Sequence, residues 1–268
     1  IINKSTVPVT TGDELEKIIS KKVKKLDENG YIEPRISEEP YDPIANQFLP
    51  DRYVEGTCPH CNYESARGDQ CDDCGKTLDS KELINPRSKL NPDAKIEFRE
   101  TEHLFFKLSE FRDVLLDWLS EGKEHWRSSV INFTRNWLKE GLIDRAVTRD
   151  LDWGIPVPHK DGDGKVLYVW FDAPIGYISS TKEWAKNENK DWELYWKDKS
   201  TKLIHFIGKD NIVFHCIIFP IILKAHGDYI LPENVPANEF LNLEGEKFST
   251  SKNWAIWIDE FLNDFPGM

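Results

Sequence analysis

Four of the five cysteines stand in two Cys-x-x-Cys pairs, within the stretch CPHCNYESARGDQCDDCG. Cys58 and Cys61 form the first pair, Cys71 and Cys74 form the second, and nine residues separate the pairs. Each pair can present two thiolates from one tight turn, and two pairs complete a tetrahedral set of sulfur ligands for Zn²⁺. Four sulfurs leave no position for a water, so the spacing predicts a structural zinc site. An odd cysteine count without a secretory segment favours a reducing, cytoplasmic compartment over a disulfide framework.

A second group of chemically useful residues forms the loop GEKFSTSKN, residues 245–253. Its lysines could stabilise the negative charge that develops when a phosphate group departs. The chain has 47 Asp and Glu against 35 Lys and Arg, and this acidic balance disfavours nonspecific nucleic-acid binding. A basic loop in such a chain therefore indicates local binding of an anion. The alternative is an ordinary surface loop, since it lacks the glycine spacing of a Walker loop. The side chains in question are Lys247, Ser249, Thr250, Ser251 and Lys252.

The segment GKDN, residues 208–211, puts a glycine and an acid between a predicted strand and a predicted helix. Gly208 would let a flat ring or a sugar approach the backbone, and Asp210 can accept hydrogen bonds from ribose hydroxyls. In the helix, Asn211, His215 and Phe219 fall at positions i, i+4 and i+8 and share one stripe. This pattern favours a nucleotide and small-molecule site. An acidic helix cap followed by a core histidine is the alternative.

Two further segments could contribute to a pocket. In YVWFDAPIGY, residues 168–177, the small residues leave space that Trp170 and Tyr177 would line with apolar area and one hydroxyl. Ordinary core packing is the alternative for Trp170. Arg149, in RDLDWG, could stabilise spreading charge during phosphoryl or nucleotidyl transfer, although most exposed arginines are only solvated.

Periodicity predicts the elements that must position these residues. Residues 13–28 predict an amphipathic helix with Leu15, Ile18, Ile19 and Leu26 near one face. Short, proline-punctuated pieces from 31 to about 107 predict a β-rich unit organised by the cysteines. Helices are predicted at 109–120 and at 128–140, the latter with Ser128 as N-cap. The part after Val147 predicts alternating strands and helices, and hence a parallel sheet with ligands at the carboxyl ends of its strands. Its predicted strands are 166–173, 203–210 and 237–245, and its predicted helices are 211–227, kinked at Pro220, and 253–265.

The bulk composition sets limits on the class of protein. The 268 residues suffice for one large domain or two modest ones. The longest apolar run, from Cys216 to Leu223, is too short to span a bilayer, so no membrane contact is expected. The chain starts with Ile1, and its one methionine is Met268. We expect a piece of a longer protein.

Several long stretches together resemble the methionyl-tRNA synthetases, a family of class I aminoacyl-tRNA synthetases. The resemblance runs from about Gly30 to Met268. The stretches that carry it are FLPDRYVEGTCPHC, ELINPRSK, FRETEHLFF, RDLDWGIPVP, LYVWFDAPIGYIS, HFIGKDNIVFH, NEFLNLEGEKFSTSK and NWAIW. It implies an α/β fold, namely the second half of a Rossmann-like class I catalytic domain with a β-rich zinc-knuckle insertion. The resemblance implies the insertion at 31–147 and the second catalytic half at 148–268, and the helical pattern adds a leading helix at 1–30.

The family activates methionine with ATP and transfers the methionyl group to the acceptor end of its tRNA, so these partners, but not DNA, are implied here. Magnesium is expected to accompany ATP. The positions that match the methionine pocket are Trp170, Ala173, Pro174, Tyr177, Asn211, His215 and Phe219. Those that match the ATP side are Gly208, Asp210, Lys247, Ser249, Thr250 and Ser251. The implied catalytic residues are Lys247, Lys252 and Arg149, and the implied zinc ligands are the four paired cysteines.

The chain also departs from the family pattern. The lysine loop resembles the signature Lys-Met-Ser-Lys-Ser, but Thr250 stands where the second lysine belongs, and Lys252 follows two residues later. The His-Ile-Gly-His signature and the anticodon-binding domain are not in this sequence. Two alternatives therefore stay open: a non-catalytic zinc-containing fragment that binds the tRNA acceptor end, and a class I synthetase for another apolar amino acid.

Overall fold

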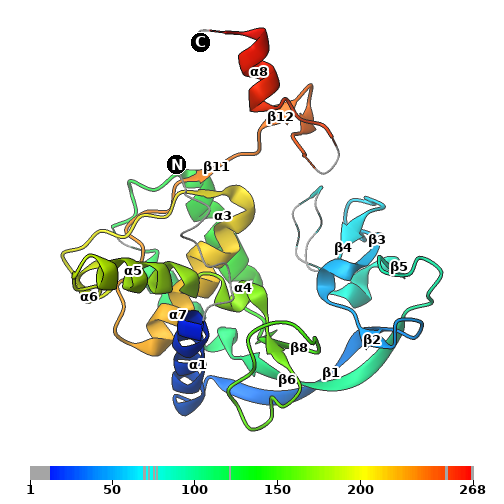
Figure 1. Cartoon of the computed structure of the whole chain (residues 1–268), viewed down its shortest axis with the longest axis horizontal. Coiled ribbons are helices and arrows are strands. Elements are labelled where there is room, and N and C mark those ends of the chain that lie inside the picture. The colour runs from blue at the N-terminus through cyan, green and yellow to red at the C-terminus, as the bar shows by residue number, and fades with distance from the viewer. Residues whose placement is uncertain are drawn as a thin grey trace.

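The computed structural model describes residues 13–68, 71, 73, 74, 76, 78–120, 122–250 and 253–266 (Figure 1). The path of the chain within these ranges runs from a first helix through a long ribbon and a small sheet into a helical body. None of the helices in these ranges is long and apolar enough to cross a membrane.

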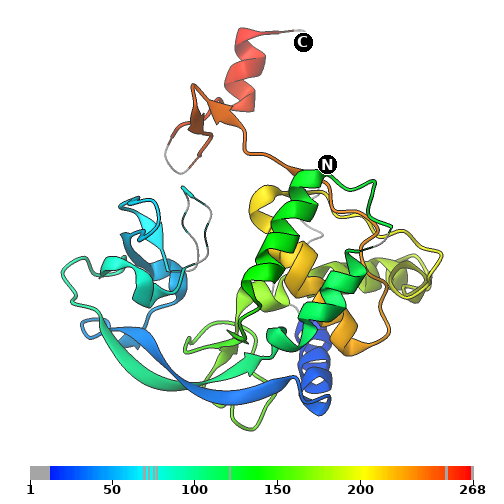
Figure 2. The same cartoon turned by 180° about the vertical axis from the view of Figure 1, so that it is seen from behind.

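A long antiparallel ribbon dominates the first half of the chain. β1 (Ile32–Asp42) pairs with β6 (Glu97–Phe106), from Ile32 opposite Phe106 to Tyr41 opposite Glu97. The short strands β2 (Gln47–Phe48) and β7 (Arg145–Ala146) complete a sheet in the order β2-β1-β6-β7. Both views show this ribbon reaching from α1 to a separate small sheet (Figures 1 and 2). The ribbon thus connects two packed units.

The small sheet carries the cysteines and has a core of its own. It has the order β4-β3-β5, with β3 (Val54–Thr57) between β4 (Ala66–Arg67) and β5 (Ile84–Ser88). The predicted β-rich character of residues 31–107 is therefore confirmed. The buried residues of this core are Leu49, Val54, Cys58, Ala66, Cys71, Leu78 and Leu83.

The main core lies among the helices of the body. α1 (Asp13–Glu28) matches its predicted span and buries Ile18, Ile19 and Leu26. The side chain of Leu15 is not among those that the structure describes. α2 (Arg112–Trp118) and α3 (Ser128–Glu140) pack into the same core. The N-cap of α3 is Arg127, not the predicted Ser128, which is already helical. Gly141 ends this helix at a φ of 103°, a conformation that glycine adopts without strain.

The second half is more helical and less regular than predicted. The segment 166–173 is not one strand: β9 (Val166–Leu167) pairs antiparallel with β8 (Thr148–Arg149), and α4 (Val169–Asp172) follows at once. Phe171 is buried against Phe106, so this apolar run was predicted correctly as core but wrongly as extended. α5 (Ile175–Asn187) and α6 (Glu193–Trp196) complete this face of the body.

The predicted parallel sheet is present as one pair of strands. β10 (Ile207–Gly208) lies parallel to β11 (Ala237–Asn238), and a parallel bridge joins Ile204 to Asn234. The long apolar helix lies between β10 and β11 in sequence. It contains a π-helical segment at Phe214–Ile218, which continues into α7 (Phe219–His226). Pro220 stands in the first turn of α7, so the irregular turn precedes the proline that was expected to kink the helix.

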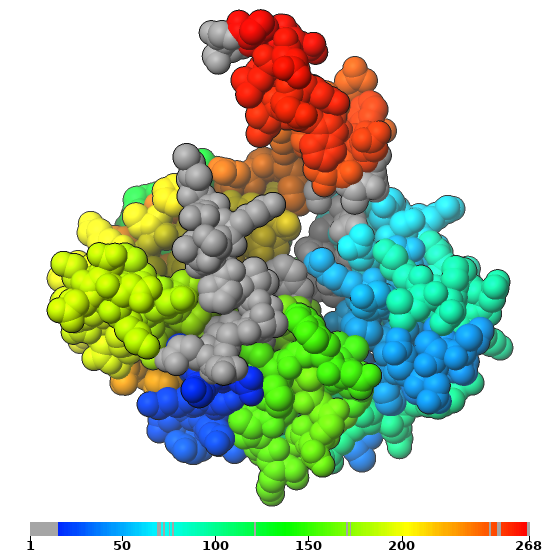
Figure 3. Space-filling model, in the orientation of Figure 1, coloured from blue at the N-terminus to red at the C-terminus, as the bar shows by residue number. Residues whose placement is uncertain are grey.

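The end of the chain stands away from the body. β12 (Asn242–Leu243) and β13 (Glu246–Lys247) form a hairpin, and α8 (Ile258–Asp264) follows without a buried residue. Figures 1 and 3 show this segment, in orange and red, projecting from the rest of the molecule. The predicted strand 237–245 is thus two short strands, β11 and β12. The predicted helix 253–265 begins later, at Ile258.

Candidate functional site

The four paired cysteines converge at one point of the small sheet. Their sulfur atoms lie within 4.8 Å of one another, with Cys61 Sγ 3.6 Å from Cys71 Sγ and Cys58 Sγ 3.9 Å from Cys74 Sγ. Four sulfurs around Zn²⁺ with bonds of about 2.3 Å form a tetrahedron with edges of about 3.8 Å. All four are free thiols rather than disulfides. The cluster therefore fits a structural zinc, as the spacing predicted.

Tight turns bring the first pair of thiols into place. Cys58 N–H donates to the Tyr63 carbonyl at 2.9 Å, and Asn62 N–H donates back to the Cys58 carbonyl at 3.0 Å. Asn62 adopts a φ of 62°, a conformation that asparagine tolerates better than most residues. His60 N–H also points at Cys58 Sγ, at 3.4 Å. This backbone donor would stabilise a metal-bound thiolate.

A box of four aromatic rings joins α5 to the π-helical segment, to the first residue of α7 and to the stretch that precedes β10. It consists of Tyr177, His205, His215 and Phe219, with ring centroids between 5.3 and 6.2 Å apart in the measured pairs. Phe219 is fully buried, while Tyr177 is 44% exposed and forms the outer wall. Three of these residues were predicted to line one pocket, and the structure does bring them together.

The hydrogen bonds in the box fix the state of His215. His215 Nδ1 lies 3.0 Å from the Asn211 carbonyl oxygen, which can only accept, so Nδ1 carries a hydrogen. Burial lowers the pKa of His215, although the Asn211 contact opposes this, and the ring is neutral at pH 7. Nε2 therefore has a lone pair, and the Tyr177 hydroxyl donates to it at 2.9 Å. Burial also raises the pKa of Tyr177, so that hydroxyl keeps its proton.

His205 was missed by the sequence reasoning. It lies in the apolar run LIHFIGKD, where a single histidine gives no periodic signal. Its only clue was its place three residues before Gly208, on a predicted strand. The structure shows it 7% exposed and facing Tyr177, His215 and Phe219.

Three other predicted methionine-pocket residues flank the elements that carry the box. Ala173 and the buried Pro174 form the joint between α4 and α5, one turn before Tyr177. Asn211 ends the short 3-10 turn Lys209–Asn211 and contacts the box through its carbonyl. The side chain of Trp170 lies outside the described part, so its prediction stays untested.

Gly208 and Asp210 lie at the carboxyl end of β10, where a strand meets a helical turn. A Cβ on Gly208 would come within 2.6 Å of Asp210 Oδ1, because the carboxylate folds back over the glycine. Asp210 is exposed, and Lys209 beside it pairs with Glu239 at 2.6 Å. This is the strand–turn–helix context that the sequence predicted for a ribose-binding acid.

The lysine loop begins in the turn of the β12–β13 hairpin and includes β13. Its base is closed by paired backbone hydrogen bonds between Ser249 and Trp254, at 2.8 and 2.9 Å, with Thr250 at its exposed tip. Ser251, Lys252 and the side chain of Lys247 lie outside the described residues. The described residues of the hairpin project from the body (Figure 2).

Arg149 occupies a different place from the box. Its Nη2 donates to Asp51 Oδ2 at 2.9 Å, and its Nη1 donates to the carbonyls of Ala146 and Thr148 at 3.0 and 2.7 Å. The guanidinium also stacks on Tyr168, 4.1 Å from the ring centroid. These contacts tie β8 to the turn Asp51–Tyr53 that precedes the small sheet.

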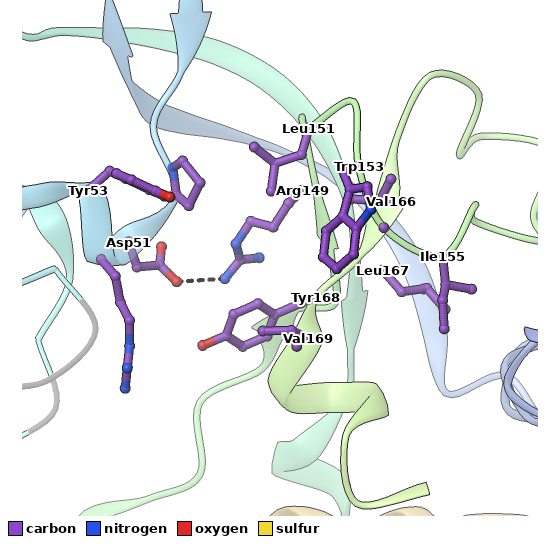
Figure 4. A pocket seen from close by; sticks show the side chains of 13 residues that line it. Asp51, Tyr53, Arg149, Leu151, Trp153, Ile155, Val166, Leu167, Tyr168 and Val169 are labelled. Atoms are coloured by element: carbon purple, nitrogen blue, oxygen red, sulfur yellow. Dashed lines mark hydrogen bonds and ion pairs between the residues drawn. The ribbon is translucent and has the colours of Figure 1, made fainter. Parts of the chain in front are cut away.

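A mostly apolar cavity of about 320 Å³ opens beside Arg149. Figure 4 shows the ion pair with Asp51 on one side and Trp153 on the other, with Tyr168 beneath the guanidinium. Trp153 is 70% exposed and stands at the mouth. The cavity lies between the small sheet and the body. An aromatic or apolar group could bind there beside a fixed positive charge.

A buried charge network lies next to this cavity and was not predicted. His103 contacts Thr148 Oγ1 through Nδ1 at 2.9 Å and Asp150 Oδ2 through Nε2 at 3.4 Å, and Lys165 also pairs with Asp150. The set looks like a nucleophile, a base and an acid. Thr148 is fully buried, however, so no substrate reaches its hydroxyl. Burial lowers the pKa of His103 to about 4, against the opposing effect of Asp150. The network is structural and fixes β8 and hence Arg149.

Comparison with known proteins agrees with the motifs. The family model described as tRNA synthetases class I (M) matches residues 2–267. The chain belongs to this family. Methionine–tRNA ligase of Christiangramia forsetii is 62% identical over 244 residues, which cover 91% of the chain and 35% of that protein. The Porphyromonas gingivalis protein of the same name is 54% identical over 258 residues and is covered to 37%.

The chain thus spans about a third of the length of these family members. A solved structure of Mycobacterium tuberculosis methionyl-tRNA synthetase in complex with methionyl-adenylate matches 94% of the chain and 43% of its own, with a TM-score of 0.65 and 21% identity. At this identity the match shows the fold: the chain is a mixed α/β region of a class I synthetase catalytic domain. The four-cysteine cluster lies in its β-rich insertion.

Proposed function

We propose that this chain is the part of a methionine–tRNA ligase that holds the amino-acid side chain and contributes to ATP binding. The observation that carries the proposal is the aromatic box, which the structure forms from Tyr177, His215 and Phe219 in a chain 62% identical to a methionine–tRNA ligase. A pocket of rings with few polar atoms suits a thioether side chain. A cytoplasmic enzyme is in keeping with the five free thiols.

The reaction needs positioning and charge stabilisation but no covalent enzyme intermediate. A methionine carboxylate oxygen attacks the α-phosphorus of Mg²⁺-bound ATP, the new P–O bond forms methionyl-adenylate, and the bond to pyrophosphate breaks. Gly208 and Asp210 would hold the ribose at the end of β10. Lys247 and Lys252 would stabilise the leaving pyrophosphate. Because the loop projects from the body in this structure, it would have to approach the site for that step. The tRNA terminal adenosine then accepts the methionyl group.

Zinc has a separate, structural role in this proposal. Cys58, Cys61, Cys71 and Cys74 would bind it as thiolates, and the metal would hold together a small sheet whose hydrophobic core has few members. The division into a leading helix at 1–30, an insertion at 31–147 and a catalytic half at 148–268 belongs to the same proposal.

Methionine-dependent exchange of pyrophosphate into ATP tests the activation step. We would measure this exchange for the 268-residue chain alone and for the complete protein that contains it. The complete protein should catalyse the exchange, and His215→Ala should reduce its rate strongly. His226→Ala is the control, because His226 lies outside the box, and it should leave the rate unchanged. A folded, zinc-loaded complete protein without methionine-dependent exchange would refute the proposal.

A non-catalytic fragment that binds the tRNA acceptor end is the second candidate. The observation in its favour is that the chain covers only 35% of its relative from Christiangramia forsetii. Such a fragment would bind tRNA and show no affinity for methionine, so titrating the chain with each ligand separates the two. A synthetase for another apolar amino acid would instead show exchange with a different member of an amino-acid panel.

A further inference from the structure

The residues around Arg149 alternate between two sides of the chain. Arg149 and Leu151 line the cavity, whereas Thr148 and Asp150 do not (Figure 4). The side chains of Thr148 and Asp150 meet instead at His103, in the buried charge network. Successive side chains of a strand point to opposite faces. Whatever holds Thr148 and Asp150 in place therefore also sets the direction of Arg149.

One imidazole holds both neighbours of Arg149. His103 Nδ1 lies 2.9 Å from Thr148 Oγ1, and His103 Nε2 lies 3.4 Å from Asp150 Oδ2. Burial lowers the pKa of His103 to about 4, so the ring is neutral at pH 7 and has one N–H. A carboxylate can only accept, so this hydrogen lies on Nε2 and the Thr148 hydroxyl donates to Nδ1. The ring thus joins the two side chains through its two different nitrogens.

Asp150 is held from two further sides. Thr101 Oγ1, on β6, donates to Asp150 Oδ2 at 2.9 Å. Lys165 Nζ pairs with Asp150 Oδ1 and donates to Thr101 Oγ1 at 3.0 Å. Lys165 comes just before β9 and faces Asp150 across the β8–β9 pair, since Arg149 lies opposite Val166. Contacts from β6 and from the start of β9 therefore fix this side of the segment.

We propose that His103 is a positioning residue for the activation step, because it holds Thr148 and Asp150 to β6 and so directs the Arg149 guanidinium into the cavity. This inference rests on the proposed function, in which Arg149 is the implied charge-stabilising residue. Arg149 Nη1 donates to the Thr148 carbonyl at 2.7 Å, so the backbone that His103 anchors also orients the guanidinium. A displacement of about 1 Å in such a group can cost about 10²-fold in rate. His103 is 2% exposed and touches no substrate itself.

Removal of one hydroxyl from the network tests the inference in the complete protein. Thr148→Val keeps the shape of the side chain but removes the group that contacts His103. Thr134→Val is the matched control, because Thr134 is also fully buried and its hydroxyl donates to the Val130 carbonyl within α3 at 2.8 Å. We would measure kcat and KM for methionine-dependent exchange of pyrophosphate into ATP. Thr148→Val should lower kcat by about tenfold and keep the KM for methionine, whereas Thr134→Val should keep both.

A double-mutant cycle with Arg149 separates positioning from general damage to the fold. Arg149→Ala alone should lower kcat by about 10²-fold, as the loss of one donor to the transition state does. If the network acts through Arg149, Thr148→Val should not lower kcat further in the Arg149→Ala protein. The same loss of kcat in both backgrounds would overturn the inference, and so would an unchanged kcat in Arg149→Ala.

A second pair of variants does not depend on Thr148. His103→Gln keeps one acceptor and one donor on its amide, whereas His103→Phe has neither, so His103→Gln should retain more of kcat. Equal values of kcat in these two variants would contradict the positioning role. A complete wild-type protein without methionine-dependent exchange overturns the proposed function. Exchange that is present but insensitive to the variants of His103 and Thr148 overturns this inference alone.

Discussion

The side chain of Lys22 ends inside the protein. Lys22 is 3% exposed, its Nζ lies 3.9 Å from the centroid of the Tyr229 ring, and it has no hydrogen-bond partner among the described residues. Burial, assisted by Lys182 and Lys197 and opposed by Asp228, lowers the pKa of Lys22 to about 7. His226 and Lys25 also lie in this basic neighbourhood. The fold therefore holds Lys22 partly as a neutral amine at pH 7.

This lysine should make stability depend on pH in a defined direction. The unfolded chain keeps the Lys22 proton up to its ordinary pKa of 10.5, whereas the folded chain releases it near 7. Between these values the unfolded state binds more protons, so the free energy of unfolding rises with pH. Each unit of pKa shift corresponds to about 1.4 kcal/mol. Lys22→Met should raise stability at pH 6 by several kcal/mol and flatten the rise between pH 7 and 10, as measured by urea unfolding. A rise of the same size in the variant would contradict the assignment.

Tyr177 should contribute to stability through its hydroxyl. Tyr177→Phe leaves His215 Nε2 buried without its donor, so the free energy of unfolding should fall by about 1–2 kcal/mol. Tyr195 is a matched control, because it is 43% exposed and its ring packs on Trp184 as Tyr177 packs on its neighbours. Tyr195→Phe should change stability by less than about 0.5 kcal/mol. Equal losses in the two variants would mean that the His215 contact contributes nothing specific.

At the scale of elements, the hairpin that opens the lysine loop depends on its two turn residues. Glu244 and Gly245 have φ values of 52° and 88°, which match the type I′ turn that two-residue hairpins prefer. A β-branched residue at a positive φ costs about 1–2 kcal/mol. Gly245→Val should therefore open the hairpin, and Glu244→Asn should tighten it. Amide hydrogen exchange at Leu243 and Glu246 measures this directly, and faster exchange in Glu244→Asn would contradict the turn assignment.

Elements with strong local signals could be predicted from the sequence. α1 has a continuous amphipathic pattern and matches its predicted span, and the cysteine knuckles depend on local spacing, so both were predicted correctly. The prediction of one strand at 166–173 was wrong, because a short apolar run is equally typical of a strand and of a buried helix. Only tertiary packing decides, and here Phe171 packs on Phe106 from a helix.

The candidate site could be predicted only where its residues give a local sequence signal. The grouping of His215 with Phe219 follows from helical spacing, and both rings lie in the box although a π-helical segment intervenes. Asn211 contacts His215 through its backbone carbonyl. His205 could not be found this way, because it comes from another element and meets the other rings only in three dimensions. Arg149 lies beside a cavity, and its predicted role in stabilising charge at the reaction centre stays a prediction. Its ion pair with Asp51, 98 residues away in sequence, leaves no local trace.

At the scale of the whole molecule, two cores are joined by the β1–β6 ribbon. The core around the cysteines and the core of the body are separate sets of buried residues. The ion pair of Asp51 with Arg149 is one polar link between the two units. Because the smaller core is held by few apolar side chains, its folding should depend on the metal, while the body should not.

Removal of zinc should therefore unfold one unit and spare the other. A strong chelator should abolish amide protection in β3 and β5, while α1 and α7 stay protected in hydrogen exchange. Cys74→Ser should reproduce this effect without chelator, because Cys74 is exposed and its loss creates no cavity. Cys216→Ala is the control: this buried thiol lies outside the cluster of four, so its loss should leave the zinc content unchanged. Full protection of β3 in metal-free protein would show that the small core is stable alone and that the cysteine cluster has another role.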